Sequence, residues 1–188
     1  GVEGQINTIA VIGADLYVGG AITSAGGAAV NNIAKWNGSS WSALGEGVDG
    51  SVSKLLPIGT DLYAAGGFTH SGAVPVSGIA KWNGASWTAL GAGLDAGGSI
   101  NALASIGTDL YAGGYFASID GVAVSGIAKW NGTSWSALGS PVATNDVTMR
   151  VVATPFKGTN NNATVALAIE FDVSKLDANE KYGFFCSF

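Results

Sequence analysis

This chain has few charged residues and little of the chemistry that most enzymes use. Only 11% of its 188 residues are charged, and it has one histidine and one cysteine. Because Cys186 is alone, an intrachain disulfide and a thiolate metal cluster are both excluded. We expect a partly buried thiol there, with a disulfide to another chain as the alternative. A Ser-His-Asp set would depend on His70, which we interpret as a surface loop residue.

The chain also lacks basic clusters and long apolar runs. The basic residues before residue 141 are Lys35, Lys54, Lys81 and Lys129. A phosphate-backbone binder needs clustered basic residues, so nucleic acid is not an expected partner. No apolar run approaches the roughly 20 residues that span a bilayer, so no membrane span is predicted. The amino terminus lacks the layout of a signal peptide, so we expect any export signal to be removed or to lie upstream.

What the chain does have is a long repeat rich in glycine and tryptophan. The triplet Asp-Leu-Tyr begins at Asp15, Asp61 and Asp109, and Lys-Trp-Asn-Gly follows twenty residues after each aspartate. A second tryptophan comes five residues after the first, and Ala-Leu-Gly closes each unit. This pattern accounts for all six tryptophans: Trp36, Trp41, Trp82, Trp87, Trp130 and Trp135. A fixed period of 46 to 48 residues indicates a repeat architecture.

Each repeat contains four short β-prone segments separated by turn residues. In the first repeat we expect strands at residues 6–12, from residue 16 into a glycine pair, at 33–36 and at 40–44. The glycine pair predicts a bulge or a close backbone approach. Asn-Gly between the last two strands predicts a type I′ turn, with positive φ at both residues. Four antiparallel strands in about 46–48 residues is the size of a propeller blade.

The predicted fold class is therefore all-β, with three four-stranded blades at residues 1–46, 47–92 and 93–140. The unit IGTDLYAGGYFASIDGVAVSGIAKWNGTSWSALG resembles the Kelch-like, galactose-oxidase-like propeller repeats of bacterial secreted and surface proteins. The resemblance implies a β-propeller over residues 1–140 and an extracellular or cell-surface location. The copper chemistry of the best known such propellers needs two histidines and a cross-linked cysteine, which this chain cannot supply. We expect no catalytic or metal site and no cofactor.

Residues 141–188 break the period and form a second, β-rich segment. We expect strands at residues 147–155 and 165–173, covered as a small sandwich or as an addition to the last blade. The stretch VVATPFKGTNNNATVALAIEFDVSKL resembles a β-rich segment that follows a von Willebrand factor type A-related domain in some bacterial exported proteins. The metal-binding signature of that domain is absent, so its adhesion chemistry is not implied.

Three blades are too few for a closed propeller, which typically has four to eight. Residues 1–4 align with residues 47–50, so we expect the chain to open inside a linker between blades. Three arrangements stay open: further blades in the same protein, several chains that pool their blades into one ring, and an open array that builds a filament. The expected partners are copies of the chain or further blades.

Repeated side chains have two interpretations each. The tryptophans are expected to form a packing layer between blades, with stacking on sugar rings as the alternative. The repeated Asp15, Asp61 and Asp109 are turn residues that bond their own backbone, or they surround a cation. The Asn-x-Ser/Thr pattern marks possible glycan acceptors at Asn37, Asn131 and Asn162.

Low charge, rigid repeats and the missing catalytic set favour a non-enzymatic extracellular structural or interaction module that assembles with itself on a cell surface or in a filament. The alternative is a carbohydrate-binding propeller that uses the loop aromatics Tyr115 and Phe116. The third possibility is a fragment of a propeller enzyme whose active residues lie elsewhere.

Overall fold

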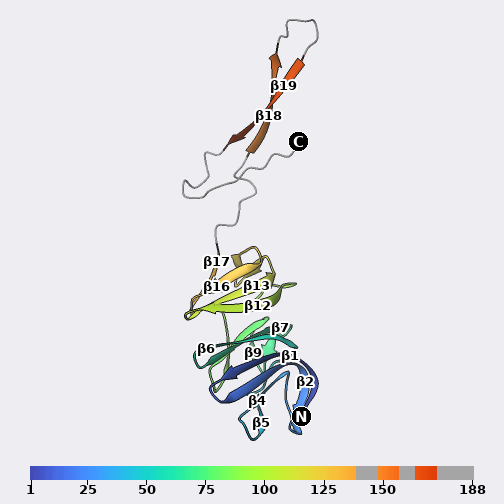
Figure 1. Cartoon of the computed structure of the whole chain (residues 1–188), viewed down its shortest axis with the longest axis vertical. Coiled ribbons are helices and arrows are strands. Elements are labelled where there is room, and N and C mark those ends of the chain that lie inside the picture. Colours follow the sequence, from blue (N-terminus) through green and yellow to red (C-terminus); the bar gives the residue numbers. More distant parts are fainter. Residues whose placement is uncertain (139–147, 157–163, 173–188) are drawn as a thin grey trace. The chain divides into compact units, whose positions relative to one another are not determined.

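A computed structural model describes residues 1–138, 148–156 and 164–172, and it confirms that the chain is all-β (Figure 1). The described residues contain strands and turns only, and no helix in them could cross a membrane. The chain divides into two compact units, Gly1–Pro141 and Val142–Phe188. We describe each unit by itself.

The first unit consists of three antiparallel sheets, one in each sequence repeat. The first sheet has the order β1 (Val2–Ile12), β2 (Asp15–Ala25), β4 (Ile33–Trp36) and β5 (Trp41–Ala43), and β3 (Ala28–Ala29) pairs with β2. The predicted strands are confirmed here, but the first begins four residues earlier than expected. A bulge between Glu3 and Gly4 lets the strand continue its pairing back to the end of β2.

The second and third sheets repeat this order. The second consists of β6 (Val52–Ile58), β7 (Asp61–Gly66), β10 (Ile79–Trp82) and β11 (Trp87–Ala89). The third consists of β12 (Ser99–Ile106), β13 (Asp109–Tyr115), β16 (Ile127–Trp130) and β17 (Trp135–Ala137). Each also carries a short hairpin, β8 (His70–Ser71) with β9 (Val74–Pro75), and β14 (Ser118–Ile119) with β15 (Val122–Ala123).

Glycines of the predicted pairs lie opposite a bulge: both glycines in the first and third repeats, and Gly66 beside Ala65 in the second. The first strand shifts register at the same place in every sheet: after Ile6, Val52 and Ile100. A side chain at Gly20 would collide with the carbonyl of Gln5. The equivalent Gly66 and Gly114 face the carbonyls of Ser51 and Ser99 in the same way. Glycine is thus required where the two backbones approach most closely.

The prediction of a type I′ turn at Asn-Gly is wrong. Trp36 pairs directly with Trp41, so the loop has four residues, and the equivalent tryptophans of the other sheets pair identically. The glycine has positive φ, 94° at Gly38, but Asn37 does not. The Asn37 side-chain oxygen instead accepts hydrogen bonds from the N–H groups of Ser39 and Ser40. The Asn37 side chain thus forms the turn: its oxygen is the hydrogen-bond acceptor, whereas in a two-residue loop the acceptor is a backbone carbonyl.

The sheets lie one after another in chain order, and the core fills the space between them (Figure 1). The first strands follow one another, since β1 lies against β6 and β6 lies against β12. One buried cluster joins the first sheet to the second, and another joins the second to the third. Each sheet therefore depends on its neighbours for burial.

The described part of the second unit is a two-stranded antiparallel sheet of β18 (Thr148–Phe156) and β19 (Thr164–Asp172). Both strands were predicted, each within one residue of its observed bounds. Their pairing runs from Thr148 with Asp172 to Phe156 with Thr164. The expected cover over these strands stays a prediction. Cys186 and Asn162 lie outside the described residues.

Candidate functional site: the two end faces and a loop pocket

The tryptophans of the second and third sheets pack against the preceding sheet, as the sequence predicts, whereas Trp36 and Trp41 of the first sheet do not. In each sheet the two rings lie against each other across the last hairpin, with centroids 5.5, 5.5 and 5.4 Å apart. The indole Nε1–H of Trp87 donates a hydrogen bond of 2.8 Å to the carbonyl of Leu44 in the preceding sheet. Trp135 makes the same bond to Leu90, at 2.9 Å. The tryptophans therefore fix the register between neighbouring sheets as well as filling space.

Each sheet has two different apolar faces. We call the side with the tryptophan pair the tryptophan face; in the second sheet it includes Val52, Leu55, Trp82 and Trp87. We call the opposite side the receiving face; in the first sheet it includes Tyr17, Ile33 and Leu44. The two buried clusters between sheets each combine a receiving face with the tryptophan face of the next sheet.

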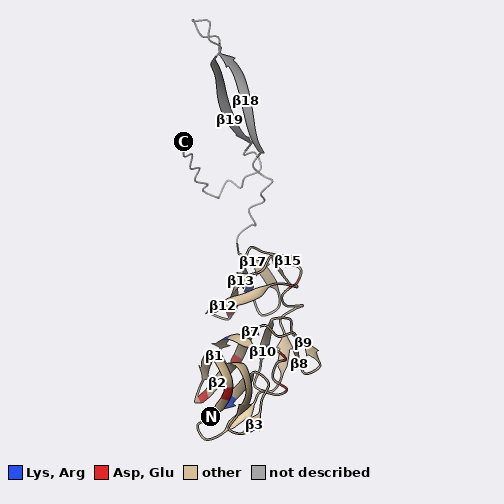
Figure 2. Ribbon diagram, turned by 90° about the vertical axis from the view of Figure 1, so that its right-hand side faces the viewer, with Lys and Arg blue, Asp and Glu red and all other residues tan. Residues whose placement is uncertain are grey.

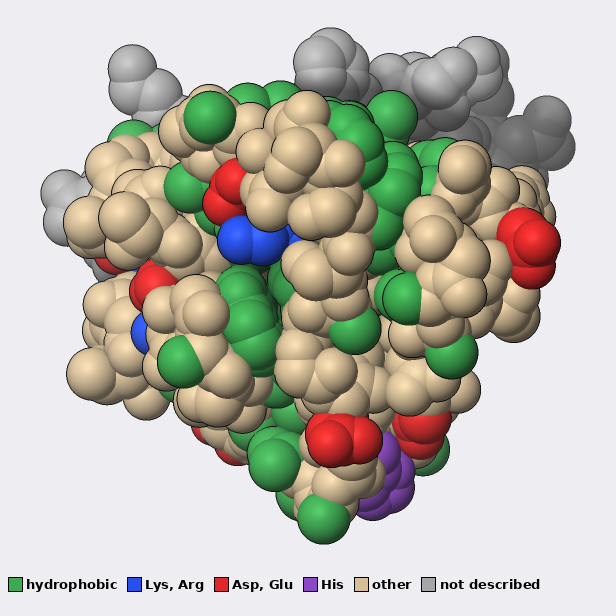
Figure 3. Space-filling model, turned by 90° about the horizontal axis from the view of Figure 1, so that it is seen from below, with side chains coloured by type: hydrophobic (Ala, Val, Ile, Leu, Met, Phe, Trp, Pro, Cys, Tyr) green, Lys and Arg blue, Asp and Glu red, His purple; other side chains and the backbone are tan. Residues whose placement is uncertain are grey.

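Among the described residues of the first unit, no other sheet packs on the tryptophan face of the first sheet. Its Ile6 is 43% exposed, whereas the equivalent Val52 and Ile100 are 0% and 2% exposed. Ile9 is 58% exposed, against 9% for Leu55. Other residues of the first sheet form a small buried cluster of their own: Val18, Ile22, Ala25, Val30 and Ala34, with Val2, Leu16 and Trp41 partly buried against them. Figure 3 views the unit from the side of the first sheet and shows hydrophobic side chains gathered in a band.

No sheet within residues 1–138 packs on the receiving face of the third sheet either. Ile127 is 42% exposed, while its equivalents Ile33 and Ile79 are fully buried. Leu138 is 41% exposed, whereas Leu44 and Leu90, whose carbonyls accept the tryptophan hydrogen bonds, are 1% exposed. Ile106, at the end of β12, is 70% exposed. The first unit thus ends in two unlike apolar faces.

Side chains of the first strands also bridge consecutive sheets. The Asn7 amide donates to the carbonyl of Val52 at 3.1 Å, and the Leu55 N–H donates to the Thr8 hydroxyl at 3.1 Å. At the next junction, the Ser53 hydroxyl donates to the carbonyl of Ile100 at 3.3 Å. These polar contacts align neighbouring sheets along their first strands. Asn101, the residue equivalent to Asn7, is exposed in β12.

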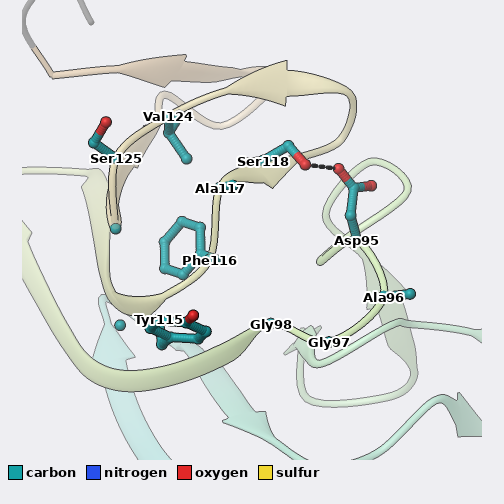
Figure 4. Close-up of a pocket in the computed structure, with 12 residues that line it drawn as sticks. Asp95, Ala96, Gly97, Gly98, Tyr115, Phe116, Ala117, Ser118, Val124 and Ser125 are labelled. Carbon is teal, nitrogen blue, oxygen red and sulfur yellow. Dashed lines mark hydrogen bonds between the residues drawn. The ribbon is translucent and has the colours of Figure 1, made fainter. Parts of the chain in front are cut away.

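A pocket of about 470 Å³ lies beside the third sheet, between the loop at residues 95–98 and the end of β13 (Figure 4). The loop is two residues longer than its equivalent at residues 49–50, and it forms one wall. Tyr115 on the rim is 80% exposed. Phe116 is only 7% exposed and belongs to the core, like the equivalent Phe68. The expectation that both aromatics are free to stack on a ligand therefore holds for Tyr115 alone.

Polar groups at this pocket are few. The Ser118 hydroxyl donates a hydrogen bond to the Asp95 carboxylate, as Figure 4 shows. Ser125 and backbone groups of the glycine-rich loop complete the lining. An exposed tyrosine that lines the same pocket as a carboxylate and hydroxyls can bind a small polyhydroxylated ring.

His70 lies on the surface, and the prediction of a surface residue is confirmed. Its Nδ1 is 2.9 Å from the Thr69 hydroxyl and 3.5 Å from Asp49, and its side chain is half exposed. Partial burial by itself would raise the pKa of Asp49. The N–H groups of His70 and Thr69 and the Thr69 hydroxyl all donate to this carboxylate and lower its pKa to about 2. The Asp49 carboxylate therefore holds the start of the second repeat to the segment at Thr69 and His70.

The repeated aspartates neither surround a cation nor bond their own turn. Asp15, Asp61 and Asp109 form ion pairs with the lysines of the third strands, Lys35 at 3.0 Å, Lys81 at 3.1 Å and Lys129 at 2.7 Å. The constant spacing of twenty residues between aspartate and lysine could have predicted these ion pairs, but neither of the two predicted roles of the aspartates included them. Figure 2 shows acidic and basic residues thinly scattered over the three sheets. Within the described residues, no three His, Cys, Asp or Glu side chains gather as metal ligands would.

Two of the three predicted glycan acceptors are in the described residues. Asn37 and Asn131 lie in exposed hairpin loops, and their side-chain oxygens accept hydrogen bonds from the Ser39 and Thr133 hydroxyls at 2.9 Å. Asn83 occupies the equivalent turn of the second repeat but is followed by Gly84 and Ala85, so it lacks the acceptor hydroxyl. Glycosylation at Asn37, Asn131 and Asn162 stays a prediction.

Comparison with models of known protein families gives no match to this chain, and neither curated proteins nor solved structures match it. The sequence resemblance to Kelch-like propeller repeats therefore stays a prediction. The geometry of the end faces and of the pocket is what bears on function.

Proposed function

We propose that this chain is a non-enzymatic structural or interaction module of the propeller type, displayed outside the cell, which works by associating with further sheets of its own kind. Two features support a propeller arrangement. The sheets have four principal strands each and pack face to face in chain order. Their first strands adjoin one another, as strands around a shared central axis do.

A single observation carries the proposal: the described part of the first unit has two buried cores between sheets and, at its two ends, apolar faces on which none of its sheets packs. These are the tryptophan face of the first sheet, where Ile9 is 58% exposed, and the receiving face of the third sheet, where Ile127 is 42% exposed. Fully burying a Val, Leu or Ile side chain is worth about 1.5–3 kcal/mol. Covering the exposed side chains of both faces would therefore stabilise the protein substantially.

The size of the purified chain tests this proposal. We expect light scattering after size-exclusion chromatography to give a mass above that of one chain, with dissociation on dilution. The physical reason is that the end faces are apolar and that, within the described first unit, only the second sheet has a neighbour on both of its faces. A strictly monomeric chain at every concentration tested would contradict the proposal.

The pocket favours a second candidate function, binding of a carbohydrate. The 80% exposed Tyr115 lines the same pocket as the Asp95 carboxylate and the Ser118 hydroxyl. A glycan array tests this with the intact chain and with Tyr115→Ala. The matched control is Ala21→Ser, a substitution at the equivalent position of the first repeat. Array signals that Tyr115→Ala removes and Ala21→Ser leaves in place would support the candidate, and an array without signals would exclude it.

A further inference from the structure

We propose that the tryptophan face of the first sheet docks on the receiving face of the third sheet of a second copy, and that two copies close a ring of six sheets. This inference rests on the proposed function, because it names the partner and the contacts through which the module assembles. Both faces belong to the first unit, and every residue used below lies in its described part.

The two end faces are complementary because the same contact already occurs twice inside the chain. Ile33 and Ile79 on receiving faces are buried by the tryptophan face of the next sheet. Ile127 is their equivalent, and it is 42% exposed, with no sheet of the first unit's described residues packed on it. The opposite end offers Ile9, the equivalent of the buried Leu55. A second copy therefore offers each end face the same kind of face that packs against its equivalents inside the chain.

The internal junctions also define the polar contacts expected at the new one. Trp87 and Trp135 donate to the carbonyls of Leu44 and Leu90. The same geometry has Trp41 of one copy donate to the carbonyl of Leu138 in the other. Asn7 donates to the carbonyl of Val52, so Asn101 is the corresponding donor to the carbonyl of Ile6 across the junction.

The number of copies follows from ring closure. Closed propellers typically contain about four to eight blades, and this chain contributes three principal sheets. Two copies supply six, whereas three copies would supply more than that range allows. A ring of two copies contains two identical junctions, each between unlike faces, and is related by a two-fold axis. An open head-to-tail chain would leave an uncovered face at each end.

Charged substitutions at the most exposed residue of each end face test the contact. Ile9→Arg blocks the tryptophan face of the first sheet, and Ile106→Arg blocks the receiving face of the third. Both side chains are more than half exposed, at 58% and 70%, so the chain should still fold. Ala85→Arg, in an exposed hairpin loop of the second sheet, adds the same charge away from both faces. Circular dichroism of each variant confirms that the strands are retained.

Native mass spectrometry is then applied to the full-length chain. We expect a dimer for the unaltered chain and for Ala85→Arg, and a monomer for Ile9→Arg and for Ile106→Arg. An equimolar mixture of the two disrupted variants should regain a dimer, because one junction of the pair then joins two unaltered faces. That recovery is specific to contact between unlike faces.

Other outcomes overturn the inference in distinguishable ways. A dimer of either disrupted variant alone would show that like faces pair, and a mixture that stays monomeric would exclude the head-to-tail contact. Assemblies that grow with concentration would show an open array instead of a ring, with the proposed function intact. An unaltered chain that stays monomeric would overturn the proposed function itself.

Discussion

The second sheet and the two end sheets have nearly the same sequence but differ in burial. Ile79 in the second sheet is fully buried, and Ile127 in the third sheet is 42% exposed. Leu55 is 9% exposed in the second sheet, whereas Ile9 in the first is 58% exposed. The local pairing is the same, since the Trp82 and Trp87 rings have the same separation as their equivalents. Strand pairing is therefore decided within a repeat, and burial is decided by the neighbouring sheet.

The largest expected effect contrasts the buried and exposed members of one repeat position. Ile79→Ala should lower the free energy of unfolding by about 2–5 kcal/mol, because it leaves a cavity between sheets. Ile127→Ala should cost about 1 kcal/mol, since much of this side chain is already in water. Both are measured by urea denaturation in the Ile9→Arg background, which excludes assembly. Equal losses would show that the third sheet is covered in solution.

The tryptophan hydrogen bond gives the next largest contrast. Trp87→Phe removes the donor to the buried Leu44 carbonyl and should cost about 1–3 kcal/mol. Among the described residues no carbonyl receives a hydrogen bond from Trp41, so Trp41→Phe should cost less in the monomer. The same denaturation measurement compares them. A larger loss for Trp41→Phe would contradict the assignment of the free face.

The ionisation of tyrosines, measured by absorbance, tests whether the receiving faces of the first and second sheets are covered. Burial raises the pKa of Tyr17 and of Tyr63, each of which lies under the next sheet. Because the pKa of both is raised in the folded chain, their contribution to stability is present below about pH 10 and is lost as the pH rises further. Absorbance titration should show delayed ionisation that Tyr17→Phe and Tyr63→Phe remove. An ordinary titration of all tyrosines would argue against the packing of the sheets.

Acid should weaken one loop of the second repeat. The pKa of Asp49 is lowered to about 2 in the folded chain, so its stabilising effect is present above about pH 4 and is lost as the pH falls towards 2. The side chain is 45% exposed, so solvent screening keeps the effect small. Asp49→Asn should reduce the acid sensitivity measured by thermal unfolding. An unchanged pH profile would show that the loop is held by other contacts.

The smallest expected effect concerns the hairpin loops. Expressed in a glycosylating host, Asn37 and Asn131 should gain glycans, and Asn83 in the second sheet should not, because only the first two are followed by an acceptor hydroxyl. Stability should change little, since these loops are exposed. Intact mass of the chain and of Asn37→Gln and Asn131→Gln measures the modification. An unmodified mass would exclude it.

Much of the fold could be predicted because its signals are local. Apolar periodicity located the strands, and the glycine pairs marked the close backbone approach at Gly20, Gly66 and Gly114. The hairpin turn was predicted at the right residues but with the wrong geometry, because the Asn37 side chain replaces a backbone acceptor. The pairs of aspartate and lysine were missed although their spacing is constant, because each was interpreted alone.

The candidate site was less predictable, because it consists of side chains that no neighbouring sheet or loop of the described residues covers. Tyr115 and Phe116 are adjacent in the sequence, yet one is exposed and the other belongs to the core. Ile106 and Ile58 occupy the same repeat position, but only Ile58 packs against a buried cluster. Periodicity alone gives every repeat the same two faces and does not say which are covered.

The sequence by itself determined the repeat, its strands and the residues of each apolar face, because strand pairing and turn chemistry act over a few residues. Only the tertiary structure decided which faces are buried. Burial depends on a neighbouring sheet some 46 to 48 residues away in the chain, and within the described first unit the first and third sheets each have one neighbour where the second has two.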